Sequence, residues 1–245
     1  YRNLLELVPW LAENSTASAA GRRVLDVGGG GGGLAVRLAA LGHPVTLLDP
    51  SPRMLELAQG RIAELPIALR DRVTTTLGTI EDLETLVPPS FDLVVCHHVL
   101  EYVEDAAHAV GALSARLQPG GILSLLCTNR LAEPLRLMQV SPRPADVGQA
   151  LDTRSFPTDA FGGRRAQYSP SELRSMLRQA GLEVLHERGI LPLTGSAPNA
   201  EIRVGDEAEW LQLEMRTGRQ QEYVGTARYV QLLATRTQRQ LGEQA

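Results

Sequence analysis

A run of six glycines is the strongest chemical signal in this sequence. Gly28 to Gly33 directly follow the apolar segment Val24-Leu25-Asp26-Val27 and directly precede the helix-like stretch 34–40. Glycine permits positive φ and lets a ligand approach the backbone, so a strand, a glycine turn and a helix predict a nucleotide-binding unit. The run contains both G-x-G-x-G and G-x-G-x-x-G. By itself it therefore leaves open whether the ligand is an NAD(P)-type dinucleotide or S-adenosylmethionine.

Acidic residues lie where such a unit would use them. Asp26 precedes the glycine turn, and Asp49, twenty-one residues after Gly28, ends the next apolar segment. A carboxylate at the end of a strand is well placed to accept hydrogen bonds from the two hydroxyls of a ribose. Glu81-Asp82 follows the third predicted strand, where a short polar turn can bond an adenine amino group.

Two adjacent histidines, His97 and His98, are candidate catalytic residues, and Tyr102 follows them closely. Successive side chains point apart, so we expect at most one of the histidines to face the ligand. An acceptor that must lose a proton, such as a phenol or an amine, would use one of them as a general base. A carboxylate acceptor is already ionised at neutral pH and needs only alignment and the exclusion of water.

Arginines are the candidate ligands for an anionic acceptor, because a guanidinium can hold a carboxylate or phosphate through two hydrogen bonds. We expect four of them to bind substrate, namely Arg154, Arg164, Arg165 and Arg228. Tyr102, Tyr168 and Tyr229 are available to stack on a base. The sequence contains no lysine, so its arginines also serve every ordinary surface role. The spacing of the cysteines and histidines does not match a zinc site, and we expect no metal.

The composition is that of an ordinary globular protein. The 245 residues are 43% hydrophobic and 21% charged, and the net charge of −4 gives no global basic field for nucleic acid. Cys96 and Cys127 both end apolar runs, which favours free thiols in a reducing cytoplasm. No apolar stretch reaches about 18 residues and no signal peptide is visible, so we expect a cytoplasmic protein. Because the chain begins with Tyr1, we expect a further N-terminal segment in the natural protein.

The elements that must position these residues alternate along the first half of the chain. Strands are predicted at 24–27, 45–48, 73–77, 91–96 and 122–127, and helices at 2–13, 33–41, 52–64 and 105–117. Ser51 and Pro52 give the third of these helices an N-cap and a first-turn proline. This alternation predicts a doubly wound, mostly parallel seven-stranded sheet that binds its ligand at the carboxyl ends of the strands.

The second half departs from this rhythm. Residues 139–168 are rich in Pro, Arg, Asp and Gly, and we expect a long loop or lid there. A helix from Ser169 to about Ala180, a sixth strand at 182–185, a helix at 206–217 and a last strand at 227–234 suggest a hairpin at one sheet edge. We therefore expect a single domain over 1–245, as a monomer or weak homodimer. It comprises a cofactor-binding half at 1–129, a lid at 139–168 and a C-terminal sheet edge at 169–245.

Three motifs occur in an order that identifies a family. They are V-L-D-x-G-x-G-x-G from Val24, L-D-P-S-x-x-M-L from Leu48 and L-x-P-G-G from Leu117. Together with His97-His98-Val99-Leu100-Glu101-Tyr102, they resemble the class I S-adenosylmethionine-dependent methyltransferases, with a Rossmann-like fold and S-adenosyl-L-methionine as the implied cofactor. An NAD(P) dehydrogenase, the main alternative enzyme, would explain the glycines and Asp49 but neither the histidine segment nor Pro119-Gly120-Gly121.

A narrower resemblance extends through the second half. Its segments are Leu100-Glu101-Tyr102-Val103, Leu123-Ser124-Leu125, Asn129, Leu213-Glu214-x-Arg216, Gln221-Glu222 and Gly225-x-x-Arg228-Tyr229. They look like the bacterial tRNA 5-carboxymethoxyuridine methyltransferases, which implies that the acceptor is the carboxylate of a modified wobble uridine in tRNA. The alternatives are a small-molecule O- or N-methyltransferase and a cofactor-binding pseudoenzyme that acts through a partner.

The resemblance also implies which residues hold the cofactor. Arg2 would reach the methionine carboxylate, Gly28 and Gly29 the cofactor backbone, Asp49 the ribose, Ile80-Glu81 the adenine edge, and His97 the methionine half. Met54 is expected to pack against the adenine. The full set of expected cofactor contacts is Arg2, Asp26, Gly28, Gly29, Gly30, Gly32, Asp49, Pro50, Met54, Ile80, Glu81, Asp82 and His97.

Overall fold

The computed structural model describes residues 21–140, 142–158, 163–195 and 207–236. The strands are β1 (Val24–Val27), β2 (Val45–Asp49), β3 (Val73–Leu77), β4 (Phe91–His97), β5 (Leu117–Thr128), β6 (Ser155–Pro157), β7 (Arg164–Ala166), β8 (Leu182–Ile190) and β9 (Tyr229–Arg236). The α-helices are α2 (Gly33–Ala40), α3 (Pro52–Ala63), α4 (Ile67–Arg70), α5 (Leu83–Leu86), α6 (Ala106–Arg116), α7 (Glu133–Val140), α8 (Pro144–Asp152), α9 (Pro170–Gln179), α10 (Glu207–Gly218) and α11 (Gln221–Val224). Two short 3-10 helices, η2 (Leu100–Tyr102) and η3 (Arg130–Ala132), follow β4 and β5.

Seven strands form one sheet in the order β3-β2-β1-β4-β5-β9-β8. The pairs among β1 to β5 are parallel, and β9 is antiparallel to both of its neighbours, β5 and β8. The strand order reverses between β1 and β4, which is where an open α/β sheet binds its ligand. The predicted fold class and the predicted antiparallel hairpin at one edge are therefore confirmed.

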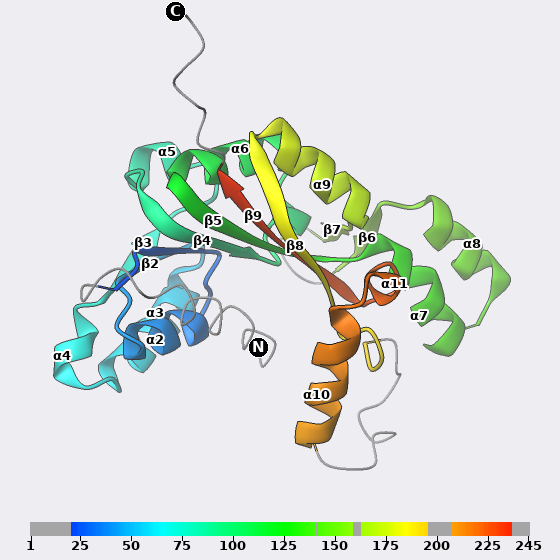
Figure 1. Cartoon of the computed structure of the whole chain (residues 1–245), viewed down its shortest axis with the longest axis horizontal. Helices are drawn as coiled ribbons and strands as arrows, with labels where there is room; N and C mark the ends of the chain where they lie inside the picture. The colour runs from blue at the N-terminus through cyan, green and yellow to red at the C-terminus, as the bar shows by residue number, and fades with distance from the viewer. Residues whose placement is uncertain (1–20, 141, 159–162, 196–206, 237–245) are drawn as a thin grey trace, which may run out of the picture.

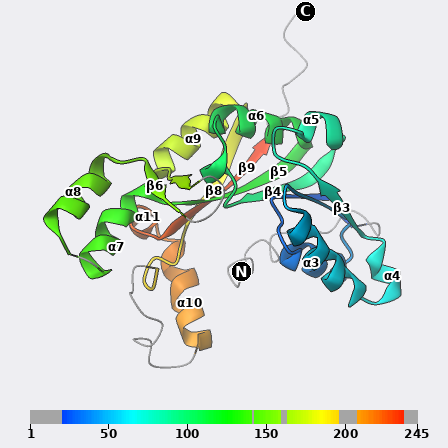
Figure 2. The same cartoon turned by 180° about the vertical axis from the view of Figure 1, so that it is seen from behind.

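Helices cover both faces of this sheet (Figure 1). One hydrophobic cluster joins the sheet to α5, α6 and α9 through side chains such as Leu83, Leu113 and Leu177. The other joins it to α2 and α3 through side chains such as Leu38 and Ala58. Seen from behind, α5, α6 and α9 again lie on the opposite side of the sheet from α3 and α4 (Figure 2). Two separate cores fix the sheet between the layers, so the strand ends hold their positions.

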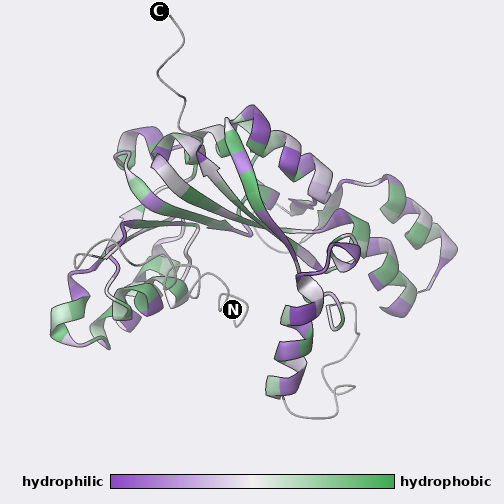
Figure 3. Ribbon diagram, viewed as in Figure 1, coloured by the Kyte–Doolittle hydropathy of each residue, from purple (hydrophilic) through white to green (hydrophobic). Residues whose placement is uncertain are grey.

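Helix boundaries follow the capping residues read from the sequence. The Ser51 side chain accepts a hydrogen bond from the Met54 amide at the start of α3. Ser169 and Glu172 form a reciprocal capping box at the start of α9, with Pro170 in its first turn. In α9, hydrophobic and hydrophilic residues alternate along the helix (Figure 3), and Leu173 and Leu177 on its inner face are fully buried.

The segment 139–168 differs from its prediction as a loop. It contains the end of α7, the helix α8 and the hairpin strands β6 and β7, which pair antiparallel. Pro144 stands in the first turn of α8, where its missing amide donor does no harm, so this proline begins a helix inside a segment that was expected to be a loop. A lid function for this segment stays a prediction. The expected helix at 2–13, which carries Arg2, lies outside the described residues.

Candidate active site

The glycine turn leads from β1 into α2 and has the backbone that glycine makes accessible. Gly28, Gly30 and Gly32 have φ values of 67°, 54° and 73°. A Cβ atom at Gly28 would collide with the Val99 side chain, whereas one at Gly30 would meet nothing within 4 Å. The space beside Gly28 is therefore filled by the Val99 side chain, and the space beside Gly30 is empty of atoms from the described residues.

Asp49 links this turn to the end of β2. Its Oδ2 accepts a hydrogen bond of 2.8 Å from the Gly30 amide and its Oδ1 one of 2.9 Å from the Ser51 amide. The side chain is only 6% exposed. The carboxylate thus fixes the glycine turn against α3 and still lines the pocket in which a ribose was expected.

Asp26 is buried at the end of β1 without the partners that Asp49 has. Its Oδ2 lacks a hydrogen-bond partner among the described residues. Burial, and then the nearby Asp49 carboxylate, raise the pKa of Asp26 to about 7. A Cβ atom at Gly29 would lie 2.7 Å from that same oxygen. An unpartnered carboxyl in a glycine-lined hollow suits a ligand that brings a positive charge or a donor.

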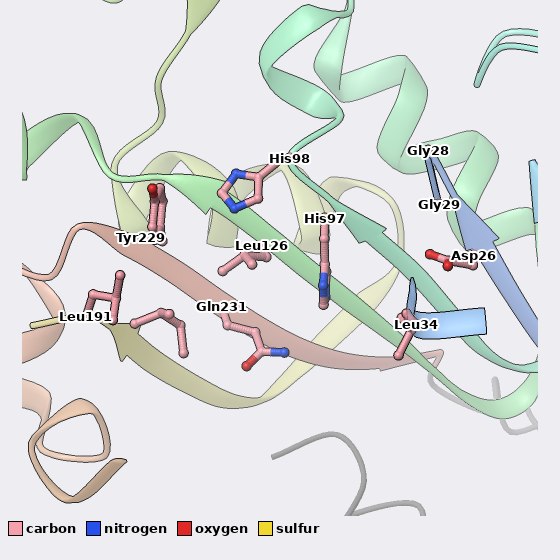
Figure 4. A pocket seen from close by; sticks show the side chains of 11 residues that line it. Asp26, Gly28, Gly29, Leu34, His97, His98, Leu126, Leu191, Tyr229 and Gln231 are labelled. Carbon is pink, nitrogen blue, oxygen red and sulfur yellow. The ribbon is translucent and has the colours of Figure 1, made fainter. Parts of the chain in front are cut away.

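Two pockets of about 300 Å³ each meet beside the glycine turn. The first is lined by Val27, Gly28, Leu48, Asp49, Pro50, Gly78, Thr79, Ile80, Glu81, His98, Val99, Tyr102 and Val103. The second is lined by Asp26, Gly28, Gly29, Leu34, His97, His98, Leu126, Ile190, Leu191, Tyr229 and Gln231 (Figure 4). The described residues that line both are Gly28 and His98.

Both histidines line the second pocket, which corrects the expectation that only one would face it (Figure 4). The reason is the backbone of His98, whose φ of 59° lies in the left-handed region and breaks the alternation of the strand. His97 stays on β4, where its Nε2 lies 2.8 Å from Ser124 Oγ. Burial, and then the neighbouring His98, lower the pKa of His97 to about 3. His97 is therefore a neutral ring at physiological pH.

Glu101, Ser124 and Gln231 were not among the site residues predicted from the sequence. Glu101 is 2% exposed and its Oε1 accepts a 2.6 Å hydrogen bond from the Thr128 amide. The Gln231 side chain donates to Ser124 Oγ at 3.0 Å, next to His97. The three-residue spacing between His98 and Glu101 could have indicated that their side chains meet, and the two are in fact 3.3 Å apart. Ser124 and Gln231 lie on β5 and β9, far apart in the sequence, so no local sequence pattern could have predicted their contact.

The structure distributes the remaining predicted cofactor residues unevenly. Pro50, Ile80 and Glu81 share the first pocket with Asp49. Asp82 instead accepts hydrogen bonds from the Thr79 amide and hydroxyl, so it shapes the turn that carries Ile80. Met54 is not brought to the adenine side. It lines a separate hollow of about 580 Å³ with Gly31, Arg61 and their neighbours.

The predicted substrate-binding arginines are not gathered at the pockets, although Tyr229 and Tyr102 are. Arg154 is paired with Glu172 at 2.9 Å, and Arg228 with the buried Glu133 at 2.7 Å. Arg165 belongs to the β6–β7 hairpin, and the side chain of Arg164 is outside the description. Among the residues that the structure describes, no arginine lines either pocket.

The described residues were also compared with the requirements for a metal and for a membrane span. Within the described ranges, no three side chains of His, Cys, Asp or Glu lie together in a way that could hold a metal ion. No helix in that part of the chain has the length and apolar character needed to cross a membrane.

Comparisons with known proteins point in one direction. A family model described as "Methyltransferase domain" matches residues 2–187. A relative from Xanthomonas euvesicatoria pv. vesicatoria (strain 85-10), named ubiquinone biosynthesis O-methyltransferase, is 36% identical over 172 residues, or 70% of this chain and 67% of the relative. An S-adenosylmethionine-dependent methyltransferase structure from Mesorhizobium loti has a TM-score of 0.61 at 23% identity, covering 93% of this chain and 96% of that one. The magnesium protoporphyrin IX methyltransferase of Synechocystis PCC 6803, solved with bound SAH, has a TM-score of 0.62 at 20% identity, covering 96% and 83%.

Proposed function

We propose that this chain, which belongs to the S-adenosylmethionine-dependent methyltransferases of the matched family, methylates a hydroxyl oxygen on a small and largely apolar molecule. The methyltransferase activity and the methyl donor follow from the family. The acceptor is the proposal. It rests on one observation above all, the apolar wall of the second pocket, whose described lining residues include no arginine.

The described residues fit the methyl donor. The first pocket has a carboxylate for a ribose at Asp49 and an apolar and polar edge for adenine at Ile80 and Glu81. The second begins at the glycine turn with the unpartnered Asp26 carboxyl, which suits the charged methionine half. When bound, the donor supplies an electrophilic methyl group on a positively charged sulfur. The sulfur of this donor joins its two halves, so its expected place is the junction lined by Gly28 and His98.

The far end of the second pocket has the chemistry of an apolar acceptor site. Leu126, Ile190 and Leu191 line it together with the Tyr229 ring. Such a lining suits the body of a small organic molecule, and the few polar groups beside it would orient one reacting atom. A carboxylate acceptor buried here would need a cation, because an unpaired buried charge is strongly unfavourable.

The relatives support oxygen as the acceptor atom. Those compared carry the name ubiquinone biosynthesis O-methyltransferase, which places the methyl group on oxygen in those proteins. The tRNA carboxylate implied by the resemblance of the sequence has less support, because Arg154 and Arg228 are paired with acidic residues and line neither pocket. The Arg228 guanidinium does lie 5.8 Å from the centroid of the Tyr229 ring, which lines the second pocket.

A labelling assay tests the proposal. The purified protein is incubated with S-adenosylmethionine carrying a labelled methyl group and with either total tRNA or a small-molecule extract. We expect label in the small-molecule fraction, stable to mild alkali because it is an ether. The variant Asp49→Ala, which loses the ribose contact and the anchor of the Gly30 amide, serves as the negative control.

Two results would contradict the proposal. Label confined to tRNA and released by mild alkali would identify a methyl ester on RNA. Label on a nitrogen atom of a small molecule would keep the small-molecule acceptor but refute the hydroxyl.

A further inference from the structure

We infer that His98 is the proton acceptor for the substrate hydroxyl and that Glu101 is the positioning residue that holds the His98 ring for this task. The inference rests on the proposed function, because a hydroxyl must lose its proton to become a methyl ether, whereas a carboxylate need not. The inference chooses His98 over His97 as the base. It also gives a role to Glu101, to which neither the sequence motifs nor the family match assigns one.

The backbone of His98 is the first observation. His98 follows β4 directly with a φ of 59°, and its amide donates a 2.8 Å hydrogen bond to the Leu126 carbonyl on β5. A left-handed conformation is unusual outside glycine and persists only where the surrounding structure enforces it, often at functional sites. Here it turns the His98 ring to the place where the two pockets meet.

The second observation is the environment of the His98 ring. Nδ1 of His98 lies 3.3 Å from Oε1 of Glu101, whose side chain is 1% exposed. The Tyr229 ring packs edge-on against the histidine, with centroids 4.8 Å apart and an interplanar angle of 77°. Glu101 therefore holds the His98 ring at Nδ1, and the Tyr229 ring holds it along one side. No hydrogen bond from a described residue occupies its Nε2.

The charge of Glu101 determines which nitrogen of His98 is protonated. Burial raises the pKa of Glu101, but the hydrogen bond and charge of His98 and the hydrogen bonds from Thr128 outweigh it, so the pKa is lowered overall. An ionised carboxylate only accepts hydrogen bonds, so Nδ1 of His98 must carry the proton. Nε2 then carries the free lone pair that a general base requires, on a side chain that lines both pockets.

His97 has the opposite properties. Its Nε2 is 2.8 Å from Ser124 Oγ, and Ser124 also accepts from Gln231. Burial, followed by the charge of His98, lowers the pKa of His97 to about 3. A ring so reluctant to be protonated is a poor proton acceptor, and it serves instead as a neutral wall of the second pocket.

The step balances without a further reagent. The acceptor oxygen forms a bond to the methyl carbon, and the bond between that carbon and sulfur breaks with its electron pair returning to sulfur. The hydroxyl proton moves to Nε2 of His98, and the buried Glu101 carboxylate stabilises the resulting imidazolium. The His98 side chain is 40% exposed, so the proton can then pass to water.

The test compares His98→Asn, Glu101→Gln and the control His186→Asn in the full chain. Asparagine tolerates the left-handed region, so His98→Asn keeps the backbone. His186 is an exposed histidine of β8. Kinetics use the acceptor found in the labelling assay and an analogue of it that carries an electron-withdrawing group, so that its hydroxyl is ionised at the assay pH.

We expect kcat on the ordinary acceptor to fall about 10²–10⁴-fold in His98→Asn and less in Glu101→Gln. In both variants the affinity for S-adenosylmethionine should fall far less than kcat on the ordinary acceptor, and so should the activity on the ionised analogue. Nitrogen NMR of the wild-type imidazoles should show Nδ1 of His98 protonated and Nε2 bare, with this tautomer preference lost in Glu101→Gln. His186→Asn should match the wild type throughout.

Equal losses on both acceptors would make His98 and Glu101 structural and overturn the inference, as would an unchanged kcat in His98→Asn. If Glu101→Gln does not fold, His98→Asn and the wild-type tautomer decide the matter. Methylation of a carboxylate alone would refute the proposed function, and with it the need for a base. Methylation of a hydroxyl with full activity in His98→Asn would refute only this inference.

Discussion

Replacing Asp26 by asparagine should stabilise the protein at alkaline pH while weakening cofactor binding. In the folded protein, burial and then the Asp49 carboxylate raise the pKa of Asp26 from 3.8 to about 7. Between these values the unfolded chain has lost a proton that the folded protein keeps, so the free energy of unfolding of the wild type falls as the pH rises. Asparagine has nearly the same shape as aspartate but does not titrate, so the variant loses this dependence of stability on pH.

The size of the effect follows from the same two pKa values. A difference of about three pH units, at about 1.4 kcal/mol for each, amounts to about 4 kcal/mol. We therefore expect the free energy of unfolding of Asp26→Asn to equal that of the wild type near pH 4 and to exceed it by up to about 4 kcal/mol at pH 8. The gain should develop between these pH values and stay constant above them.

Urea unfolding followed by circular dichroism, without cofactor and across this pH range, measures the effect. Asp71→Asn, at an exposed carboxylate after α4, is the matched control and should change little at any pH. Calorimetry with S-adenosylmethionine should show weaker binding to Asp26→Asn, because the charge that destabilises the free protein is the one that its ligand uses. A stability difference that is the same at every pH, or an Asp26→Asn that is less stable at pH 8, would refute this reasoning.

Two further predictions concern the glycine turn and the core. Gly28→Ala forces a side chain into the left-handed region and against Val99, so we expect at least a tenfold loss of cofactor affinity by calorimetry, about 1–3 kcal/mol. Gly60→Ala, in α3 with nothing within 4 Å, should keep that affinity and gain about 0.5–1 kcal/mol in urea unfolding. Leu113→Ala, at a fully buried side chain of α6, should lower the free energy of unfolding by about 2–5 kcal/mol. Leu151→Ala, at a side chain 61% exposed, should change it by less than about 0.5 kcal/mol, and similar losses in both would contradict the assignment of the core.

The parts of the fold that local chemistry determines were readable from the sequence. The strands β1 to β4 were predicted to within one residue. β1, β2 and β4 are short, mostly apolar runs, and β3 is a run of β-branched valine and threonines that ends at Leu77. Ser51 and Ser169 were recognised as helix starts for the same local reason, since each caps the amides that follow it. The glycine turn and Asp49 were likewise fixed by their place at strand ends.

The misread parts depend on contacts between distant segments. The helix α8 and the β6–β7 hairpin lie in a stretch whose prolines and glycines suggested a loop. Arg154 and Arg228 were expected at the substrate, but Glu172 and Glu133 pair with them. The left-handed backbone of His98 breaks the alternation of β4, so both histidines line the second pocket, which the period of a strand does not predict. Met54 was expected to pack against the adenine, but it does not line the first pocket and lies instead in the separate hollow with Gly31 and Arg61.

The position of β9 has a consequence for how the protein is made. This last strand lies between β5 and β8, and its residues Tyr229 and Gln231 line the second pocket. On the ribosome, β1 to β5 can pair as they emerge, but β8 has no neighbour in the sheet until β9 has been synthesised. The sheet edge at β5 stays open until then, as a template for association with other chains. The second pocket is therefore completed late in synthesis, so a chain released early lacks this pocket and carries an open sheet edge by which quality control can recognise it.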